Sequence, residues 1–260
     1  MAKETVLVTG ASSGIGRELA RLFAADGADL VLVARRRTLL DELAAELTRA
    51  HAVAVRVMAM DLADPAAPRA LVERLAADGV SVDVLVNNAG FGAVGAFAET
   101  PAERLFDMVQ VNLTALTHLT RLLLPPMIQR RRGGVLNVGS TAGFQAGPGM
   151  AVYYATKAFV LSLTEALAEE TAGTGVRLTL LAPGPTHTEF AAAAQMESAL
   201  LFRLGAMSAA AVARAGYRGF RSGKRIVIPG FLNRLGAFMV RFVPRAVARK
   251  VAARLNRLPK

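Results

Sequence analysis

Four polar residues in the middle of the chain have the types and spacing for acid–base chemistry on an oxygen atom. Tyr153 and Lys157 are four residues apart, so on a helix they would share one face, and Ser140 and Asn112 precede them. An unperturbed tyrosine has a pKa of about 10, and we expect the neighbouring lysine cation to lower that pKa. Ser140 could hold a carbonyl or hydroxyl oxygen while Tyr153 passes the proton. Such a set could interconvert an alcohol and a carbonyl if a hydride carrier bound beside it.

The N-terminal segment has the pattern of a site for such a carrier. Thr5–Thr9 is an apolar, β-branched run typical of a buried parallel strand, and a helical pattern follows the glycines to about Ala25. A glycine-rich turn between strand and helix brings backbone amides and the helix N-terminus to a pyrophosphate. The spacing here is G-x-x-x-G-x-G, and an ordinary glycine-rich turn is the alternative reading. We predict a dinucleotide site that includes Gly10, Ser12, Ser13, Gly14, Ile15 and Gly16.

Three consecutive arginines follow the second predicted strand. A site for NAD usually has Asp or Glu at this place, about 20 residues after the glycines, to bind the ribose hydroxyls. Ala34 stands there instead, followed by Arg35, Arg36 and Arg37. Guanidinium groups suit a 2′-phosphate, so we predict NADP(H), with contacts from Arg35 and Arg36. A solvated basic loop is the alternative, and it describes Arg37 best.

Six motifs occur in order along the chain: Thr9–Gly16 (TGASSGIG), Asn87–Gly90 (NNAG), Asn112, Ser140, Tyr153-x-x-x-Lys157 and Pro183-Gly184. Taken together, they resemble the motifs of the short-chain dehydrogenase/reductase family in its branch of roughly 250 residues. The resemblance extends from residue 1 to about residue 230. It implies a catalytic set of Asn112, Ser140, Tyr153 and Lys157. It also implies that the lysine holds the nicotinamide ribose and that the asparagine helps to keep a proton-relay water.

The same resemblance implies further contacts with the cofactor. Asp61 and Leu62, after the third strand, are expected beside the adenine. The residues after the fourth strand are expected to line the ribose region, and those after the sixth to bracket the nicotinamide. These two groups are Asn88, Ala89 and Gly90, and Pro183, Gly184 and Thr188. Read without the family, these segments are polar turns after apolar strands.

Apolar runs alternate with helical stretches along the chain. Beyond Thr5–Thr9, the strand candidates are Leu30–Ala34, Val53–Met58, Val82–Val86, Val135–Val138, Val176–Leu181 and Arg225–Ile228. This alternation indicates βαβ units and a parallel sheet. We therefore predict an α/β fold: a Rossmann-type doubly wound parallel sheet of about seven strands with helices on both faces. Residues 1–230 would form the dinucleotide-binding and catalytic domain, and residues 231–260 a basic, amphipathic helical extension.

Composition excludes several classes of protein. The chain has no cysteine, and its histidines (His51, His118 and His187) are scattered, so nothing suggests a metal site. The first strand begins almost at once, and no apolar run reaches about 18 residues, so we expect neither a signal peptide nor a membrane-spanning helix. We expect a cytoplasmic protein, with peripheral contact at a membrane surface as the alternative.

The excess of basic over acidic residues lies entirely in the last quarter of the chain. Residues 198–260 contain 14 Lys or Arg and no Asp or Glu, whereas residues 1–197 contain 17 basic and 20 acidic residues. Beyond Phe231, apolar residues recur at helical spacing on both sides of Pro244, which predicts two short helices. We favour a helix pair packed on the domain or on another subunit. The alternative is a basic amphipathic element that lies on anionic lipid. Nucleic-acid binding is disfavoured because the segment shows no pattern of aromatic residues interleaved with its basic ones for stacking on bases.

The substrate is the least constrained part of the prediction. Residues 189–207 are largely apolar, and in the family this region forms a lid over the substrate. An apolar lid suits a hydrophobic carbonyl compound; a plain helix packed on the sheet explains the same pattern equally well. The family also suggests a homodimer or homotetramer. Two rival functions stay open: a non-catalytic NADPH-binding sensor or scaffold that docks through its basic tail, and an epimerase or dehydratase.

Overall fold

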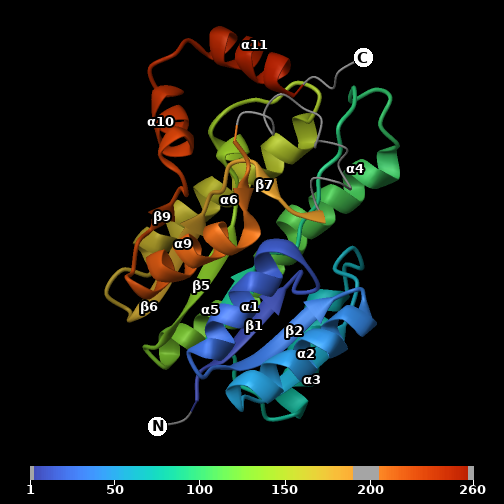
Figure 1. The fold of residues 1–260 in the computed structure, drawn as a ribbon, viewed down its shortest axis with the longest axis vertical. Coiled ribbons are helices and arrows are strands. Elements are labelled where there is room, and N and C mark those ends of the chain that lie inside the picture. Colours follow the sequence, from blue (N-terminus) through green and yellow to red (C-terminus); the bar gives the residue numbers. More distant parts are fainter. Residues whose placement is uncertain (1–2, 190–204, 257–260) are drawn as a thin grey trace.

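The computed structural model describes residues 3–189 and 205–256. Within these ranges, seven strands form one fully parallel sheet in the order β3-β2-β1-β4-β5-β6-β9 (Figure 1). The strands are β1 (Thr5–Thr9), β2 (Asp29–Ala34), β3 (Val55–Ala59), β4 (Val84–Asn87), β5 (Gly133–Val138), β6 (Val176–Leu181) and β9 (Ile226–Val227). The predicted doubly wound parallel sheet is thereby confirmed, and its strand order reverses between β1 and β4.

Helices cover both faces of the sheet. The elements α1, α2 and α9 pack on one face, and α3, α5 and α6 pack on the other. The helices are α1 (Gly14–Ala25), α2 (Arg37–His51), α3 (Ala67–Ala77), α4 (Ala102–Val109), α5 (Leu116–Gln129), α6 (Ala151–Glu170), α9 (Ala209–Arg221), α10 (Phe231–Met239) and α11 (Arg245–Leu255). A short parallel pair, β7 (Thr186–His187) with β8 (Met207–Ser208), lies outside the main sheet and was not predicted.

The central strands are apolar on both sides because each side faces a helix layer. Along β1, Val6 and Val8 point into the core under α1 and α2, whereas Leu7 points into the core under α3 and α5. Successive side chains alternate between faces in this way in every strand. The unbroken apolar runs in the sequence are therefore what a parallel sheet covered on both faces requires.

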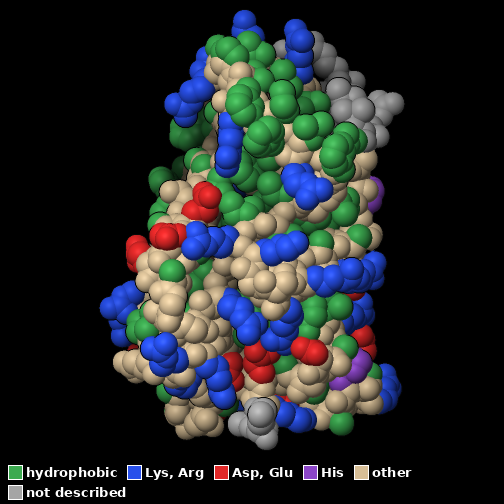
Figure 2. Space-filling model, turned by 90° about the vertical axis from the view of Figure 1, so that its left-hand side faces the viewer, with side chains coloured by type: hydrophobic (Ala, Val, Ile, Leu, Met, Phe, Trp, Pro, Cys, Tyr) green, Lys and Arg blue, Asp and Glu red, His purple; other side chains and the backbone are tan. Residues whose placement is uncertain are grey.

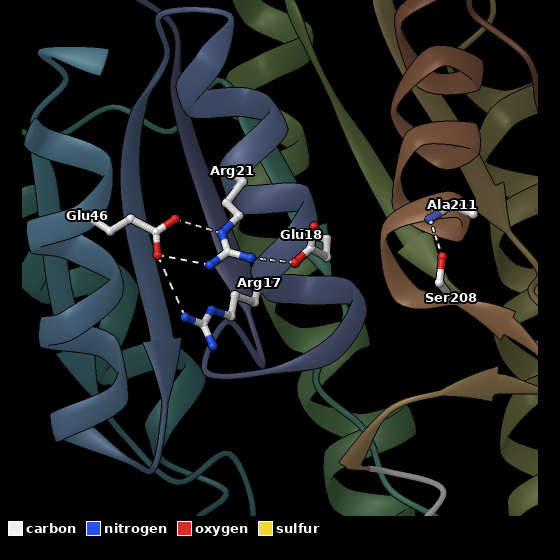
Figure 3. Close-up of polar contacts among 6 residues, drawn as sticks. All are labelled: Arg17, Glu18, Arg21, Glu46, Ser208 and Ala211. Carbon is white, nitrogen blue, oxygen red and sulfur yellow. Dashed lines mark hydrogen bonds and ion pairs between the residues drawn. The ribbon is translucent and has the colours of Figure 1, made fainter. Parts of the chain in front are cut away.

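An ion-pair cluster on the surface ties α1 to α2 (Figure 3). Arg21 donates two hydrogen bonds to the carboxylate of Glu46, at 2.8 and 2.9 Å, and Arg17 lies 3.7 Å from the same carboxylate. The pair is partly solvated, so its stabilising effect is modest. It nevertheless fixes α1, whose N-terminus follows the glycine-rich turn. In the same view, Ser208 caps α9 by accepting a hydrogen bond from the backbone N–H of Ala211.

The C-terminal elements α10 and α11 follow the last strand and lie at the end of the molecule to which the strands of the sheet point (Figure 1). Pro244 is the residue before α11, so the prediction that it separates two short helices is confirmed. In the part of the chain with described coordinates, no helix has both the length and the hydropathy needed to cross a bilayer.

Candidate active site

A cavity of about 530 Å³ opens at the carboxyl ends of the central strands. Much of its lining comes from the ends of six strands and the turns that follow them: residues 10 and 12–15 after β1, 33–36 at the end of β2, 60–63 after β3, 88–92 after β4, 138–142 at the end of β5 and 183–186 after β6. In an open α/β sheet, ligands bind at this edge, where the strand order reverses. The sheet topology therefore brings together residues that are far apart in the sequence.

The glycine-rich turn is shaped around the side chain of Asn88. Gly10 has a φ angle of +65°, which favours glycine, and Asn88 donates from Nδ2 to the carbonyls of Thr9 and Gly10 at 3.0 and 3.1 Å. A Cβ atom at Gly16 would collide with this same amide. Gly16 therefore allows close packing behind the turn and does not line the described cavity, whereas Gly10, Ser12, Ser13, Gly14 and Ile15 do.

Arg35 and Arg36 both line the cavity where β2 ends. Arg36 donates hydrogen bonds to Ser12 Oγ at 3.0 Å and to Glu189 Oε2 at 2.6 Å, and Arg35 lies 4.0 Å from the carboxylate of Asp61. The hydrogen bond from Arg36 lowers the pKa of Glu189. Two guanidinium groups thus stand beside the glycine-rich turn.

Arg37, by contrast, begins α2 and forms an exposed ion pair with Asp41, 3.4 Å away. It does not line the cavity among the described residues. This placement agrees with its interpretation as a solvated residue, and it distinguishes Arg37 from the two arginines before it.

Tyr153 and Lys157 lie in the first two turns of α6 and both line the cavity. The Nζ atom of Lys157 is 5.8 Å from the centre of the Tyr153 ring and donates a 2.9 Å hydrogen bond to the carbonyl of Val138, at the end of β5. Lys157 is only 6% exposed, so its ammonium group is held between α6 and the sheet. Tyr153 and Lys157 therefore share one face of α6, as predicted.

The expected direction of the Tyr153 pKa shift is wrong. Burial raises the pKa of Tyr153 to about 12, although a hydrogen bond with Ser140 acts in the opposite direction. Burial also lowers the pKa of Lys157 to about 8. Removal from water disfavours the charged form of each group, and the spacing in the sequence does not reveal this effect. The phenol is therefore neutral around pH 7, in the form that can donate a proton.

Ser140 stands at the end of β5, next to Tyr153. Its hydroxyl accepts a 3.1 Å hydrogen bond from the backbone N–H of Ala142 and so caps the 3-10 helix η2 (Thr141–Phe144). The carbonyl of Pro183 lies 3.4 Å from the same hydroxyl. These contacts fix the side chain at the cavity wall, where it is hydrogen bonded to Tyr153.

Asn112 lies behind the cavity wall. It belongs to a π-helical segment, η1 (Gln110–Ala115), between α4 and α5, and it is 1% exposed. Its side chain accepts from the N–H of Phe91 at 3.0 Å and donates to the carbonyl of Phe91 and to Thr156, at 2.9 and 3.2 Å. Its amide group thus joins the loop after β4 to α6, and Asn112 is not among the described lining residues. Short π-helical segments are frequent at functional sites.

A row of buried polar side chains, which sequence reasoning missed, crosses the sheet beneath the cavity. Asn87 on β4 donates to Thr120 of α5 at 3.0 Å and to Asn137 of β5 at 2.9 Å. Asn137 in turn donates to Thr164 of α6 at 2.9 Å. We call these four residues the polar ladder. Because all four are buried and paired, the ladder ties two helices to two strands in one register.

The remaining predicted residues are placed at the cavity as well. These are Asp61, Leu62, Asn88, Ala89, Gly90, Pro183, Gly184 and Thr188. The predicted lid, by contrast, lies largely in residues 190–204, outside the described residues.

Several lining residues were not identified from the sequence. They include Phe91, Arg104, Asp107, Met150 and Tyr154. Tyr154 is 6% exposed, and its hydroxyl is hydrogen bonded to Asn256. Its position next to Tyr153 was the available signal. The partner from the C-terminus could not be foreseen.

The histidines lie on separate elements. His51 is the last residue of α2, His118 lies in α5, and His187 lies in β7. Across residues 3–189 and 205–256, His, Asp and Glu nowhere gather in a group of three or more that could hold a metal ion.

Comparison with known proteins gives consistent matches. The family model described as short chain dehydrogenase matches residues 4–198. Sulfoacetaldehyde reductase 2 of Chromohalobacter salexigens is 40% identical over 193 residues, which span 72% of this chain and 74% of that protein.

Two solved structures are similar over almost the whole chain. A short-chain dehydrogenase from Sphingobium yanoikuyae in complex with NADPH has a TM-score of 0.82 and 38% identity, covering 90% of this chain and 91% of that one. The bulky-bulky ketone specific alcohol dehydrogenase from Comamonas testosteroni has a TM-score of 0.78 and 31% identity, covering 95% and 97%.

Proposed function

Because this chain belongs to the short-chain dehydrogenase/reductase family, we propose that it interconverts a carbonyl and an alcohol on a hydrophobic small molecule with NADP(H). One observation carries the proposal. Ser140, Tyr153 and Lys157 line the same cavity as the glycine-rich turn and two arginines. A proton donor, an oxygen-binding hydroxyl and a site for a phosphorylated carrier thus occupy one space.

The cavity fits NADP(H) at several points. The backbone around Gly10 and Gly14, with the hydroxyls of Ser12 and Ser13, would hold the pyrophosphate at the N-terminus of α1. Arg35 and Arg36 would hold the 2′-phosphate, and no carboxylate follows directly after β2 to bind ribose hydroxyls in its place.

Other lining residues would complete the cofactor site. Asp61 and Leu62 would lie beside the adenine, and Asn88, Ala89 and Gly90 along the ribose. Lys157, Pro183, Gly184 and Thr188 would bracket the nicotinamide end. When bound, NADPH supplies a hydride to the carbonyl carbon.

Tyr153 is the proposed general acid. Ser140 and Tyr153 donate hydrogen bonds to the carbonyl oxygen, and Tyr153 transfers its proton as negative charge develops on that oxygen. A pKa of about 12 keeps the phenol protonated until that charge appears. In the oxidative direction the same groups act in reverse.

Lys157 and Asn112 support this step in different ways. The Lys157 ammonium, 5.8 Å from the ring centre, stabilises the phenolate that remains after proton transfer. Asn112 is a positioning residue in this scheme, because its amide is hydrogen bonded to Phe91 and Thr156. Through these bonds it supports the wall along which a proton-relay water would lie.

The residues on the substrate side of the cavity support the proposal that the substrate is a hydrophobic carbonyl compound. Phe91, Val111, Ala142, Met150 and Tyr154 contribute apolar surface there. A ligand on this apolar wall would be oriented by the polar groups beside it, among them Ser140 and Tyr153. The similarity to a bulky ketone dehydrogenase supports the same class. As in other family members, we expect a homodimer or homotetramer.

The deciding experiment is NADPH consumption, with NADH in parallel, against a panel of apolar aldehydes and ketones. Tyr153→Phe should abolish turnover and leave NADPH affinity nearly unchanged. Tyr217→Phe is the matched control, because Tyr217 lies on α9 and binds Asp26 away from the cavity. Tight NADPH binding without turnover would favour the sensor. Product formation without net NADPH oxidation would favour an epimerase or dehydratase.

A further inference from the structure

The C-terminal hairpin, which we define as residues 231–256 with α10 and α11, exposes large apolar side chains. Of the ten exposed large hydrophobic residues in the described part of the chain, eight lie between residues 231 and 251. They are Phe231, Leu232, Leu235, Phe238, Met239, Phe242, Val247 and Val251. Figure 2 shows hydrophobic side chains gathered at this end of the molecule, with Lys and Arg side chains among them. Surface this apolar usually marks an interaction site.

The hairpin packs on the domain through other residues. Ala237 and Ala252 are buried, Asn233 donates a 2.8 Å hydrogen bond to the carbonyl of Pro229, and Asn256 is 4% exposed. Of the two packings favoured from the sequence, on the domain or on another subunit, the first is therefore wrong for the large apolar stripe. Small and amide side chains face the domain, and the large apolar ones face outward.

The charge of this surface has one sign. Basic residues are interspersed with the exposed apolar ones: Arg234, Arg241, Arg245, Arg249, Lys250 and Arg254, all exposed. No Asp or Glu occurs between residues 198 and 260. The hairpin therefore presents an apolar surface inside a field of positive charge, and its partner must offer apolar contacts together with negative charge.

A second copy of the chain fits this surface poorly. A two-fold dimer places the same patch on both subunits, so arginines would face arginines with no carboxylate in the patch to pair them. Nucleic acid supplies the negative charge but does not cover a row of aliphatic side chains. We propose that the C-terminal hairpin binds the surface of an anionic phospholipid bilayer, with its apolar side chains in the acyl region and its arginines at the phosphates.

The proposed membrane surface adjoins the cavity. A Cβ atom at Gly184, which lines the cavity, would collide with the side chain of Asn233 on α10. At the other end, Tyr154 lines the cavity and binds Asn256 just after α11. A protein docked through the hairpin would therefore hold its substrate side close to the lipid.

The test is sedimentation of the full chain with vesicles of phosphatidylcholine, with or without about a third of phosphatidylglycerol. We expect binding to the anionic vesicles that is at least about tenfold stronger and that weakens with added salt. Phe238→Ser with Phe242→Ser should reduce binding to anionic vesicles by about tenfold or more. The centres of these two rings are 5.1 Å apart. The matched control is Phe97→Ser, because Phe97 is an exposed phenylalanine outside the hairpin.

A charge variant tests the second half of the proposal. Arg245→Gln with Arg249→Gln should remove most of the preference for anionic vesicles, whereas Arg49→Gln on α2 should not. NADPH binding and circular dichroism would show that each variant is folded. Absence of binding to anionic vesicles, or equal binding by wild type and both hairpin variants, would overturn the proposal. So would a wild-type dimer that becomes monomeric in the phenylalanine variant without any vesicle binding, because a second copy would then cover the surface.

Discussion

The hydroxyl of Tyr154 donates a 3.0 Å hydrogen bond to Oδ1 of Asn256, a residue 102 positions further along the chain. Asn256 in turn donates from Nδ2 to the carbonyl of Pro148, at 3.1 Å, in the loop before α6. Both side chains are almost fully buried. The end of the C-terminal hairpin is therefore attached to the turn of α6 that carries Tyr153.

Asn256→Ala should loosen the hairpin and destabilise the protein. The substitution leaves the buried Tyr154 hydroxyl without this partner, which costs about 1–3 kcal/mol. Urea unfolding would measure the change, and trypsin would report faster cleavage at the hairpin arginines. Tyr154→Phe removes the donor as well, so the double variant should lose less than the sum of the two single variants. Additive losses and unchanged cleavage would mean that the hydrogen bond does not hold the hairpin.

The reductive reaction should slow as the pH rises through about 8. Burial lowers the pKa of Lys157 to about 8, so its ammonium charge is lost there, while a pKa of about 12 keeps Tyr153 protonated. The value of kcat/KM for NADPH reports the free enzyme, so we expect it to fall about tenfold per pH unit above that point. A value that stays constant up to about pH 10 would show that the lysine charge is not required.

Lys157→Met should stabilise the fold at neutral pH while abolishing activity. The pKa of Lys157 falls from 10.5 to about 8 on folding, so the folded state disfavours the cation below pH 8 by on the order of 3 kcal/mol. Between about 8 and 10.5, the unfolded chain keeps this proton and the folded chain has lost it. The stability of the wild type should therefore rise with pH in that window.

Comparing the wild type with Lys157→Met isolates the effect of the lysine charge on stability. The advantage of Lys157→Met in urea unfolding should shrink as the pH rises from about 7 to about 10. The raised pKa of Tyr153 has the opposite sign above pH 10, and it cancels in the difference because both proteins contain the tyrosine. If the difference in unfolding free energy between the two proteins did not change with pH, Lys157 would destabilise the fold through its packing and not through its charge.

Arg36→Ala should weaken NADPH binding by about tenfold or more and change NADH binding little, because charge-assisted hydrogen bonds contribute about 1.5–3 kcal/mol. Arg37→Ala is the matched control, since Arg37 pairs with Asp41 outside the cavity. Glu189→Gln should strengthen NADPH binding modestly, because Glu189 competes for Arg36. Isothermal titration would measure all three. Equal losses for NADPH and NADH would contradict a 2′-phosphate contact.

The parts of the site that follow from local spacing could be predicted from the sequence. The strand, glycines and helix at the N-terminus, and the shared face of Tyr153 and Lys157, depend on residues within a turn or two of one another. Strand ends were shifted by a residue or two. Val53, for example, is buried but precedes β3, which begins at Val55.

Features that depend on the assembled fold could not be predicted in this way. The direction of the Asn112 side chain depends on the π-helical segment, and the pKa of Tyr153 depends on how many elements exclude water from it. The contact of Tyr154 with Asn256 joins distant segments. The amphipathic pattern of α10 showed that one face differs from the other, but it did not show which face meets the domain.

The polar ladder should make the four elements that it joins, α5, α6, β4 and β5, less mobile than the rest of the molecule. Its amide and hydroxyl groups are buried and mutually bonded, so moving α5 or α6 relative to β4 and β5 would leave several of them unpaired. Amide hydrogen exchange should be slowest in these four elements. On the opposite side of the cavity, the exposed ion pair of Arg36 and Glu189 closes over the turn at Ser12 and opens at little cost. Entry and release of the nucleotide can therefore proceed there while the groups around Tyr153 keep their alignment.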